Sequence, residues 1–154
     1  MCYHKITMRK LSIILALLAL SFGCLSKAHD VNYSHKLQVG KQKLMAEIVQ
    51  TPEAMQQGLS ERTSMQDNEG MLFDLGSTKK IPAFWMKDMK FNLGLIWIAE
   101  GKIIGITSNV PAPTGSGQLP TYRPPAPVNQ VLEVNAGWTE KNDIKVGDEI
   151  KLND

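Results

Sequence analysis

The sequence is poor in cysteine: of its 154 residues only Cys2 and Cys24 are cysteines. The chain beyond position 24 therefore forms no disulfide within itself and no cysteine-based metal site. It also lacks a nucleophile elbow, a phosphate-binding loop and a glycine-rich dinucleotide turn. His29 and His35 stand far along the chain from other candidate ligands, so we predict neither a metal site nor a cofactor.

Basic side chains are also few outside the N-terminal segment. Residues 1–28 carry Lys5, Arg9, Lys10 and Lys27, and the rest of the chain has 13 basic and 15 acidic side chains, a net charge of −2. A nucleic-acid-binding domain normally keeps a basic stripe on its folded part. We therefore predict no nucleic-acid partner.

The N-terminal segment has the three parts of a secretion signal. Arg9 and Lys10 precede an apolar run of twelve residues at positions 11–22, and small residues follow. Such a run is too short to span a bilayer. We predict that residues 1–28 direct export and that the domain works in the periplasm or outside the cell.

Two kinds of processing fit the end of this signal. Ser26-Lys27-Ala28 places small residues where a signal peptidase reads them, which releases a chain beginning at His29. Residues 20–24, Leu-Ser-Phe-Gly-Cys, instead form a lipobox in which Cys24 is lipidated. The sequence leaves both open, and a lipid anchor at Cys24 is the one membrane contact that we predict.

Residues 29–154 predict one mainly β domain. Alternating runs on either side of Gly40-Lys41 and of Glu100-Gly101 indicate two hairpins. Thr51 followed by Pro52, with a stop at Gly58, predicts one short helix over residues 52–57. Further strands are expected at residues 71–75, 82–86, 128–134 and 149–152, and a helical turn over 139–143. Together these elements predict an antiparallel β-sandwich or squashed barrel with one short helix near the start of the domain.

A proline-rich stretch separates the second hairpin from the next strand. Six prolines lie between positions 108 and 127, which excludes a helix or an inner strand there. Loops of this length in compact domains are usually functional or disordered. We interpret the stretch either as one wall of a groove, with Tyr122 and Arg123 facing Trp85 and Trp138, or as a cover over an exposed sheet edge.

Four segments, taken in order, resemble the bacterial and archaeal family called domain of unknown function 192. The segments are Gly58-Leu59-Ser60-Glu61-Arg62, Gly70-Met71-Leu72-Phe73-Asp74, Phe84-Trp85-Met86-Lys87-Asp88 and Val131-Leu132-Glu133-Val134-Asn135-Ala136-Gly137. The resemblance implies a compact β-rich fold with one helix, often behind an export signal, and supplies no reaction. The family's usual Pro-Leu-Asp run corresponds here to Asn92-Leu93-Gly94. Because the family's acidic position is Gly94, an activity that needs that carboxylate does not carry over.

Candidate ligand contacts gather where the strand at 82–86 should end. Trp85, Lys87 and Asp88 form either an aromatic platform beside a charge pair or a solvated turn next to the core. Arg62 follows the helix stop and either clamps a ligand carboxylate or, as we favour, ties loops together. The predicted ligand-binding residues are Trp85, Lys87, Asp88, Arg62, Tyr122 and Arg123.

Carboxylates supply the only catalytic candidates. Asp88, Glu133 and Glu61 are the residues that we single out, with Asp74 as a further acid beside a strand. Two of them act as an acid and base pair only where the fold brings them within about 5–10 Å. The linear sequence does not show such an arrangement.

The residues favour a non-catalytic envelope module that binds glycan or peptide through residues 85–88, with the proline-rich loop opposite. The alternative is a hydrolase or lyase that acts on envelope polymers through Asp88, Glu133 and Glu61. A third possibility is a structural accessory that docks onto another envelope protein, for which a large exposed apolar patch is the expected sign.

Overall fold

The structure, a computed structural model, describes residues 33–115 and 117–153. The predicted signal and Cys24 lie outside these residues. The described chain contains the strands β1 (His35–Val39), β2 (Gln42–Val49), β3 (Glu69–Asp74), β4 (Phe84–Trp85), β5 (Leu93–Ala99), β6 (Lys102–Val110), β7 (Thr121–Tyr122), β8 (Gln130–Asn135) and β9 (Ile150–Asn153), with the helices α1 (Pro52–Gln57) and α2 (Trp138–Lys141). This confirms the predicted mainly β fold, and its helices are short.

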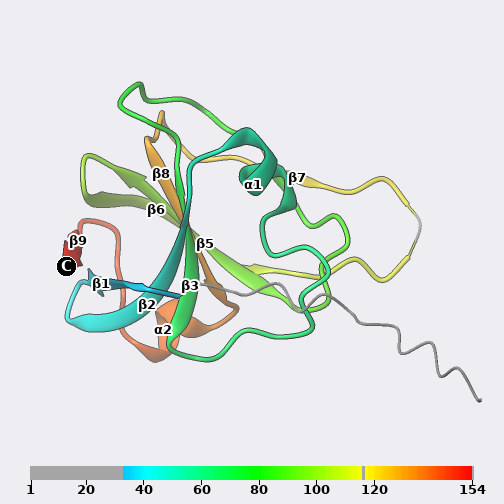
Figure 1. Ribbon diagram of the computed structural model, residues 1–154, viewed down its shortest axis with the longest axis horizontal. Helices are drawn as coiled ribbons and strands as arrows, with labels where there is room; N and C mark the ends of the chain where they lie inside the picture. The colour runs from blue at the N-terminus through cyan, green and yellow to red at the C-terminus, as the bar shows by residue number, and fades with distance from the viewer. Residues whose placement is uncertain (1–32, 116, 154) are drawn as a thin grey trace, which may run out of the picture.

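Seven strands form one sheet that curls into a half-barrel (Figure 1), in the order β6-β5-β8-β3-β2-β1-β9. Every pair in this sheet is antiparallel except β2 and β3. The crossover from β2 to β3 contains α1, which is the usual way to connect parallel neighbours. The edge strands β6 and β9 approach each other at one end of the half-barrel. Two hydrogen bonds join them there, from Ile103 N–H to Asp148 O (2.9 Å) and from Ile150 N–H to Gly101 O (2.8 Å).

Both predicted hairpins and the predicted helix are present. The Glu100-Gly101 turn between β5 and β6 has positive φ at both residues, 53° and 74°, the geometry that a tight two-residue hairpin requires. At the start of α1 the Thr51 hydroxyl accepts a hydrogen bond from Ala54 N–H at 3.2 Å. The helix ends at Gly58, whose φ is 51°, so the local sequence sets both ends.

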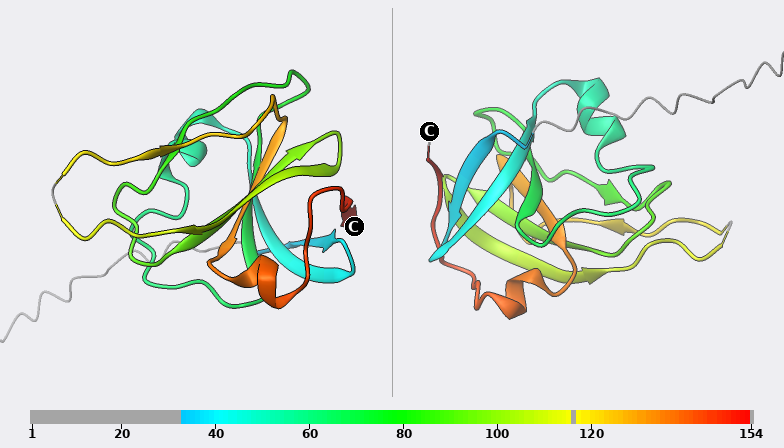
Figure 2. Two further views of the ribbon diagram at one scale, coloured as in Figure 1. Left: turned by 180° about the vertical axis from the view of Figure 1, so that it is seen from behind. Right: turned by 60° about the horizontal axis from the view of Figure 1, so that its bottom comes forward.

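The structure differs from the sequence pattern in the middle of the chain. The strand expected at residues 82–86 is reduced to the two residues of β4, which pair with β7 in a separate small sheet. The proline-rich stretch provides β7, and its first residues continue β6 as far as Val110. Between these strands it extends away from the half-barrel (Figure 2), and no helix forms over the described part of it.

Two cores lie on opposite faces of the central strands. Residues on one face of β5 and β8 pack inside the half-barrel with Leu37, Leu44 and Trp138. Residues on the other face pack beneath α1 and the small sheet, with Phe73, Met86 and Val128. Because both faces are covered, β5 is buried at six of its seven positions and shows an almost continuous apolar sequence. The second core is the one that carries the candidate site.

Among the described residues no helix is long and apolar enough to cross a bilayer.

Candidate functional site

A cavity of about 280 Å³ opens between α1, the small sheet and the outer face of the large sheet. Its walls are mainly apolar side chains, and Glu133 of β8 is the one acidic residue among them. The lining residues are Met55, Gln56, Gln57, Gly58, Leu59, Ser60, Phe73, Leu75, Pro82, Ala83, Phe84, Trp85, Met89 and Glu133. All four segments of the family resemblance contribute to this one lining, although they are far apart in the sequence.

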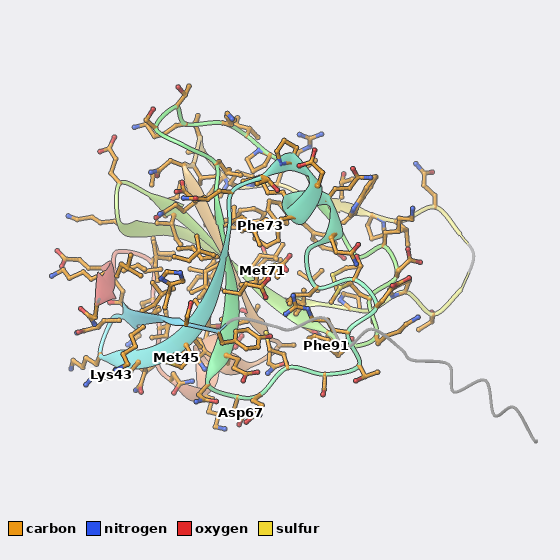
Figure 3. All side chains as sticks on the ribbon, in the orientation of Figure 1. Lys43, Met45, Asp67, Met71, Phe73 and Phe91 are labelled. Atoms are coloured by element: carbon orange, nitrogen blue, oxygen red, sulfur yellow. The ribbon has the colours of Figure 1, made fainter. Side chains whose placement is uncertain are left out.

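Glu133 is buried on the cavity side of the sheet. It lies directly opposite Met71 of β3 and Leu95 of β5, and only 6% of its surface is exposed. Figure 3 shows Met71 and Phe73 along β3, beside α1. Burial among these apolar neighbours raises the pKa of the Glu133 carboxyl to about 8, while the positive charge of Arg62 acts in the opposite direction.

The Glu133 carboxyl has no hydrogen-bond partner among residues 33–115 and 117–153. Among the described residues, burial and the Arg62 charge are what shift its pKa, and no hydrogen bond is among the causes. None of the described polar side-chain atoms is both fully enclosed and unpartnered. The unpartnered oxygens of Glu133 are therefore reached from the cavity that it lines, where they are free to contact a ligand.

Trp85 stands at the rim of the cavity because of the alternation along β4. Its neighbour Phe84 packs inward, with its ring 5.0 Å from that of Phe73 and 5.7 Å from that of Trp97, both edge to face. Successive side chains of a strand point to opposite faces, so Trp85 turns outward and is 55% exposed. An anchored backbone with an exposed indole ring makes a rigid aromatic platform.

A second depression of about 290 Å³, here called the acidic groove, adjoins the cavity. It shares Gln56, Gln57, Ser60 and Trp85 with the cavity. Its charged lining residues are Glu53, Glu61, Asp88 and Lys87. Three carboxylates against one ammonium give this groove a negative charge, and it lies next to the apolar cavity with Trp85 belonging to both.

Two hydrogen bonds join the loop after α1 to the turn after β4. The Ser60 hydroxyl donates to Lys87 O at 3.0 Å, and Glu61 N–H donates to Asp88 O at 3.0 Å. Glu61 and Asp88 both have positive φ, 66° and 58°, a conformation that is uncommon for non-glycine residues. These two hydrogen bonds thus hold the walls of the acidic groove together, and Lys87, Asp88 and Glu61 remain exposed.

Arg62 lies beside the site and is already occupied. Its guanidinium donates to Glu47 Oε2 at 2.8 Å and to the Tyr33 hydroxyl at 3.1 Å. Only 14% of the Arg62 side chain is exposed. These contacts tie the loop after α1 to β2, which agrees with the structural interpretation of Arg62. It does not line either depression, and its role as a ligand contact stays a prediction.

The remaining predicted partners do not line the two depressions. Tyr122 pairs with Phe84 across the small sheet, and neither Tyr122 nor Arg123 is among the residues that line the cavity or the groove. Trp138 packs into the interior core and not against Trp85. The Asp74 carboxylate accepts hydrogen bonds from Gln50 Nε2 and Gly76 N–H. The proline-rich loop as a groove wall therefore stays a prediction without a lining residue to support it.

Gly94 lies on the sheet face opposite Glu133. It pairs with Val134, whose side chain belongs to the interior core, and a Cβ at Gly94 would come within 3.3 Å of Val134 Cγ2. A carboxylate at this position would enter the half-barrel, because paired residues of adjacent strands share a face. The glycine therefore removes no carboxylate from the cavity.

Several lining residues were not anticipated from the sequence. Met55, Gln56 and Gln57 belong to α1, and Phe73 belongs to β3, where they read as ordinary helix and core residues. Glu133 was only a catalytic candidate, since nothing in its sequence neighbourhood shows that it is buried and unpartnered. The family resemblance was the sequence feature that could have located the cavity, because its four segments all contribute to the lining. Among the described residues, no cluster of three metal-ligating side chains occurs.

Comparison with known proteins gives a family and a fold. The model of the DUF192 family, described as "Uncharacterized ACR", matches residues 35–152. A protein of unknown function from Novosphingobium aromaticivorans has a similar structure, with a TM-score of 0.68, 25% identity, and coverage of 75% of this chain and 83% of that one. A Sinorhizobium meliloti protein described as a "putative transcription regulator" has a similar structure with a TM-score of 0.66 and 30% sequence identity. The match covers 77% of this chain and 91% of that one. No curated protein matches the chain.

Proposed function

Because this chain belongs to the DUF192 family, whose four characteristic segments here surround one cavity, we propose that it is a non-catalytic binding module. The cavity and the acidic groove together form its ligand site. The single observation that carries the proposal is the unpartnered Glu133 carboxyl, which is 6% exposed and lines the cavity. A buried polar group without a partner costs free energy, which a bound ligand recovers.

The ligand that we propose is a glycan or peptide of the cell envelope. Trp85 offers an exposed aromatic face, which suits sugar rings and extended peptides. The cavity, at about 280 Å³, lies just below the roughly 300–1,000 Å³ range of ligand pockets, which suits one ring or one side chain. The proposed envelope location depends on the signal at residues 1–28.

The test is retention of separated envelope fractions by the immobilised protein. The Trp85→Ala, Lys87→Ala double variant is compared with wild type, and Val146→Ala serves as the control because Val146 is also an exposed apolar residue but lines neither depression. We expect wild type and Val146→Ala to retain a polysaccharide or peptide that the double variant loses. Equal retention by all three proteins contradicts the proposed site.

Export is tested separately by the mass of the N-terminal peptide of the protein recovered from its native host. Cleavage after Ala28 gives a chain that begins with His29, and lipidation gives a diacylglyceryl-modified Cys24. Either mass supports an envelope location. A chain that keeps residues 11–22 in the recovered protein contradicts it.

One observation favours a second function, a hydrolase or lyase of envelope polymers. A carboxyl whose pKa is raised to about 8 by an apolar cavity is protonated at neutral pH and suits a general acid. Its potential partners Asp88 and Glu61 line the adjoining groove and not the cavity itself. Release of fragments from an envelope polymer by wild type and not by Glu133→Gln supports this function, and binding without any release contradicts it.

A further inference from the structure

The one acidic group that lines the cavity is the carboxyl of Glu133, among mainly apolar side chains. Glu133 is 6% exposed, and the residues around it in the cavity include Leu59, Phe73 and Met89. No described side chain donates a hydrogen bond to it. The cavity therefore suits a ligand that has an apolar stem with one polar group at its tip, because any other polar atom on the stem would be buried without a partner. A donor at that tip bonds the carboxylate form of Glu133.

The rim adds a second, independent requirement. The acidic groove carries Glu53, Glu61 and Asp88 against the single ammonium of Lys87. Charge complementarity at a binding surface steers association and sets specificity. A ligand that lies across Trp85 therefore meets the Glu133 carboxyl at its cavity end and negative charge at its groove end.

We propose that the site binds a basic peptide segment, with one lysine side chain inserted beside Trp85 so that its ammonium group meets Glu133. The next positive residue of the peptide lies over the acidic groove. This inference rests on the proposed binding function and specifies its ligand. Neighbouring residues of one extended peptide thus occupy the cavity and the acidic groove.

Lysine fits the cavity better than arginine does. Its side chain is a four-carbon apolar stem that ends in a compact ammonium group, whereas the guanidinium of arginine presents five donors in a planar fork. The cavity offers one carboxyl at its buried end, which leaves most donors of an arginine without acceptors. We therefore expect a lysine peptide to bind more tightly than its arginine counterpart.

Binding of a cation is expected to depend on pH with a definite sign. The free protein holds a proton on Glu133 up to a pKa of about 8, and that proton must leave for the carboxylate to pair with an ammonium group. Lysine itself stays charged, since its pKa is about 10.4. Affinity should therefore rise with pH, approaching tenfold per unit below pH 8. A neutral ligand that accepts a hydrogen bond from protonated Glu133 shows the opposite trend.

Charged groups around Glu133 do not change this sign. Its cross-strand neighbours from β3 and β5 are Met71 and Leu95, and neither one titrates. Arg62 is the one charged group that affects the pKa of Glu133, and it keeps its charge throughout the range. The charged residues that line the adjoining groove are Glu53, Glu61, Asp88 and Lys87.

The experiment is calorimetric titration of the purified protein with the blocked peptide acetyl-Gly-Lys-Lys-Gly-amide. Matched peptides carry Nε-acetyl-lysine, norleucine or arginine in place of both lysines. Protein variants are Glu133→Gln and, as the matched control, Glu100→Gln, which makes the same chemical change at an exposed residue outside both depressions. A circular dichroism spectrum of each variant verifies its fold.

We expect the lysine peptide to bind at least tenfold more tightly than the acetylated and norleucine peptides. Glu133→Gln should lose at least tenfold in affinity and become independent of pH between 6 and 8, whereas Glu100→Gln should behave as wild type. Weaker affinity at pH 8 than at pH 6, or equal binding of the lysine and norleucine peptides, overturns the inference.

A neutral arm separates this inference from the proposed function. Envelope oligosaccharides and the norleucine peptide are titrated into wild type and Trp85→Ala. If a neutral ligand binds in a Trp85-dependent way and the lysine peptide does not bind, the binding function stands and the basic-peptide inference is wrong. If no ligand in either arm binds, both are overturned.

Discussion

Glu133 of β8 lies directly opposite Met71 of β3 in the antiparallel pair, so a carboxyl group faces a thioether in the apolar layer beneath α1. The pair explains why the carboxyl resists ionisation: methionine offers no hydrogen-bond donor and no positive charge. Leu95 on the other neighbouring strand is equally apolar. The apolar neighbours leave Glu133 available to a ligand. They also lower the stability of the ligand-free protein when Glu133 is ionised.

The raised pKa of Glu133 predicts that the protein loses stability as the pH rises. The pKa of Glu133 is about 8 in the folded chain and 4.5 without burial. Between these values the folded state keeps a proton that the unfolded state releases, so the free energy of unfolding should fall by about 1.4 kcal/mol per pH unit from Glu133 alone. Urea unfolding at pH 5 to 8.5 measures this slope for wild type and for Glu133→Gln, which should lack it. Parallel curves for the two proteins would show that Glu133 is ionised in the folded state.

Arg62→Ala should destabilise the fold and raise the pKa of Glu133 further. The substitution removes the hydrogen bonds to Glu47 and Tyr33 and leaves a partly buried carboxylate without its partner, which costs about 1–3 kcal/mol. It also removes the positive charge that lowers the pKa of Glu133. Urea unfolding measures the first effect and carbon-detected NMR titration of Glu133 the second. Arg62→Lys should retain part of the stability and part of the lowering of the Glu133 pKa. An unchanged Glu133 pKa in Arg62→Ala would contradict the electrostatic effect of Arg62 on Glu133.

Gly94→Asp should destabilise the protein without creating a second carboxylate at the cavity. A Cβ at this position comes within 3.3 Å of Val134 Cγ2 and 3.4 Å of Ser108 O, and a carboxylate there would be buried on the interior face of the sheet. Gly94→Ala supplies the matched control for the added Cβ. We expect the aspartate variant to be less stable than the alanine variant, by about 1–3 kcal/mol in urea at pH 7. Equal stability would mean that the aspartate reaches water or a partner.

Gly70→Ala tests the close packing between β3 and the strand beside it. A Cβ at Gly70 would lie 2.8 Å from the backbone oxygen of Glu133 and 2.8 Å from Leu44 Cδ2, so the substitution must shift the strand that carries the cavity carboxyl. We expect a loss of about 1–3 kcal/mol in thermal or urea unfolding. Gly117→Ala is the control, because nothing lies within 4 Å of a Cβ there. A Gly70→Ala protein as stable as this control would contradict the packing.

The sequence determined the elements that depend on local interactions. Thr51, Pro52 and Gly58 define α1 because capping and positive φ are properties of a few adjacent residues. The Glu100-Gly101 turn likewise fixed the hairpin of β5 and β6. The resemblance to DUF192 rested on short segments and was confirmed over residues 35–152. These features require no knowledge of which distant segments meet.

Tertiary structure alone decided the site. Trp85, Lys87 and Asp88 were predicted to act together and do line one groove. Glu133 shares the adjoining cavity with Trp85 only because β8 pairs between β3 and β5. Strand order depends on contacts between residues far apart in the chain, which local patterns do not encode. The sequence also placed Tyr122, Arg123 and Trp138 near Trp85. Tyr122 lies beside the strand that carries Trp85, whereas Trp138 packs into the interior core. The burial of one glutamate, and with it the chemistry of the cavity, followed from that strand order.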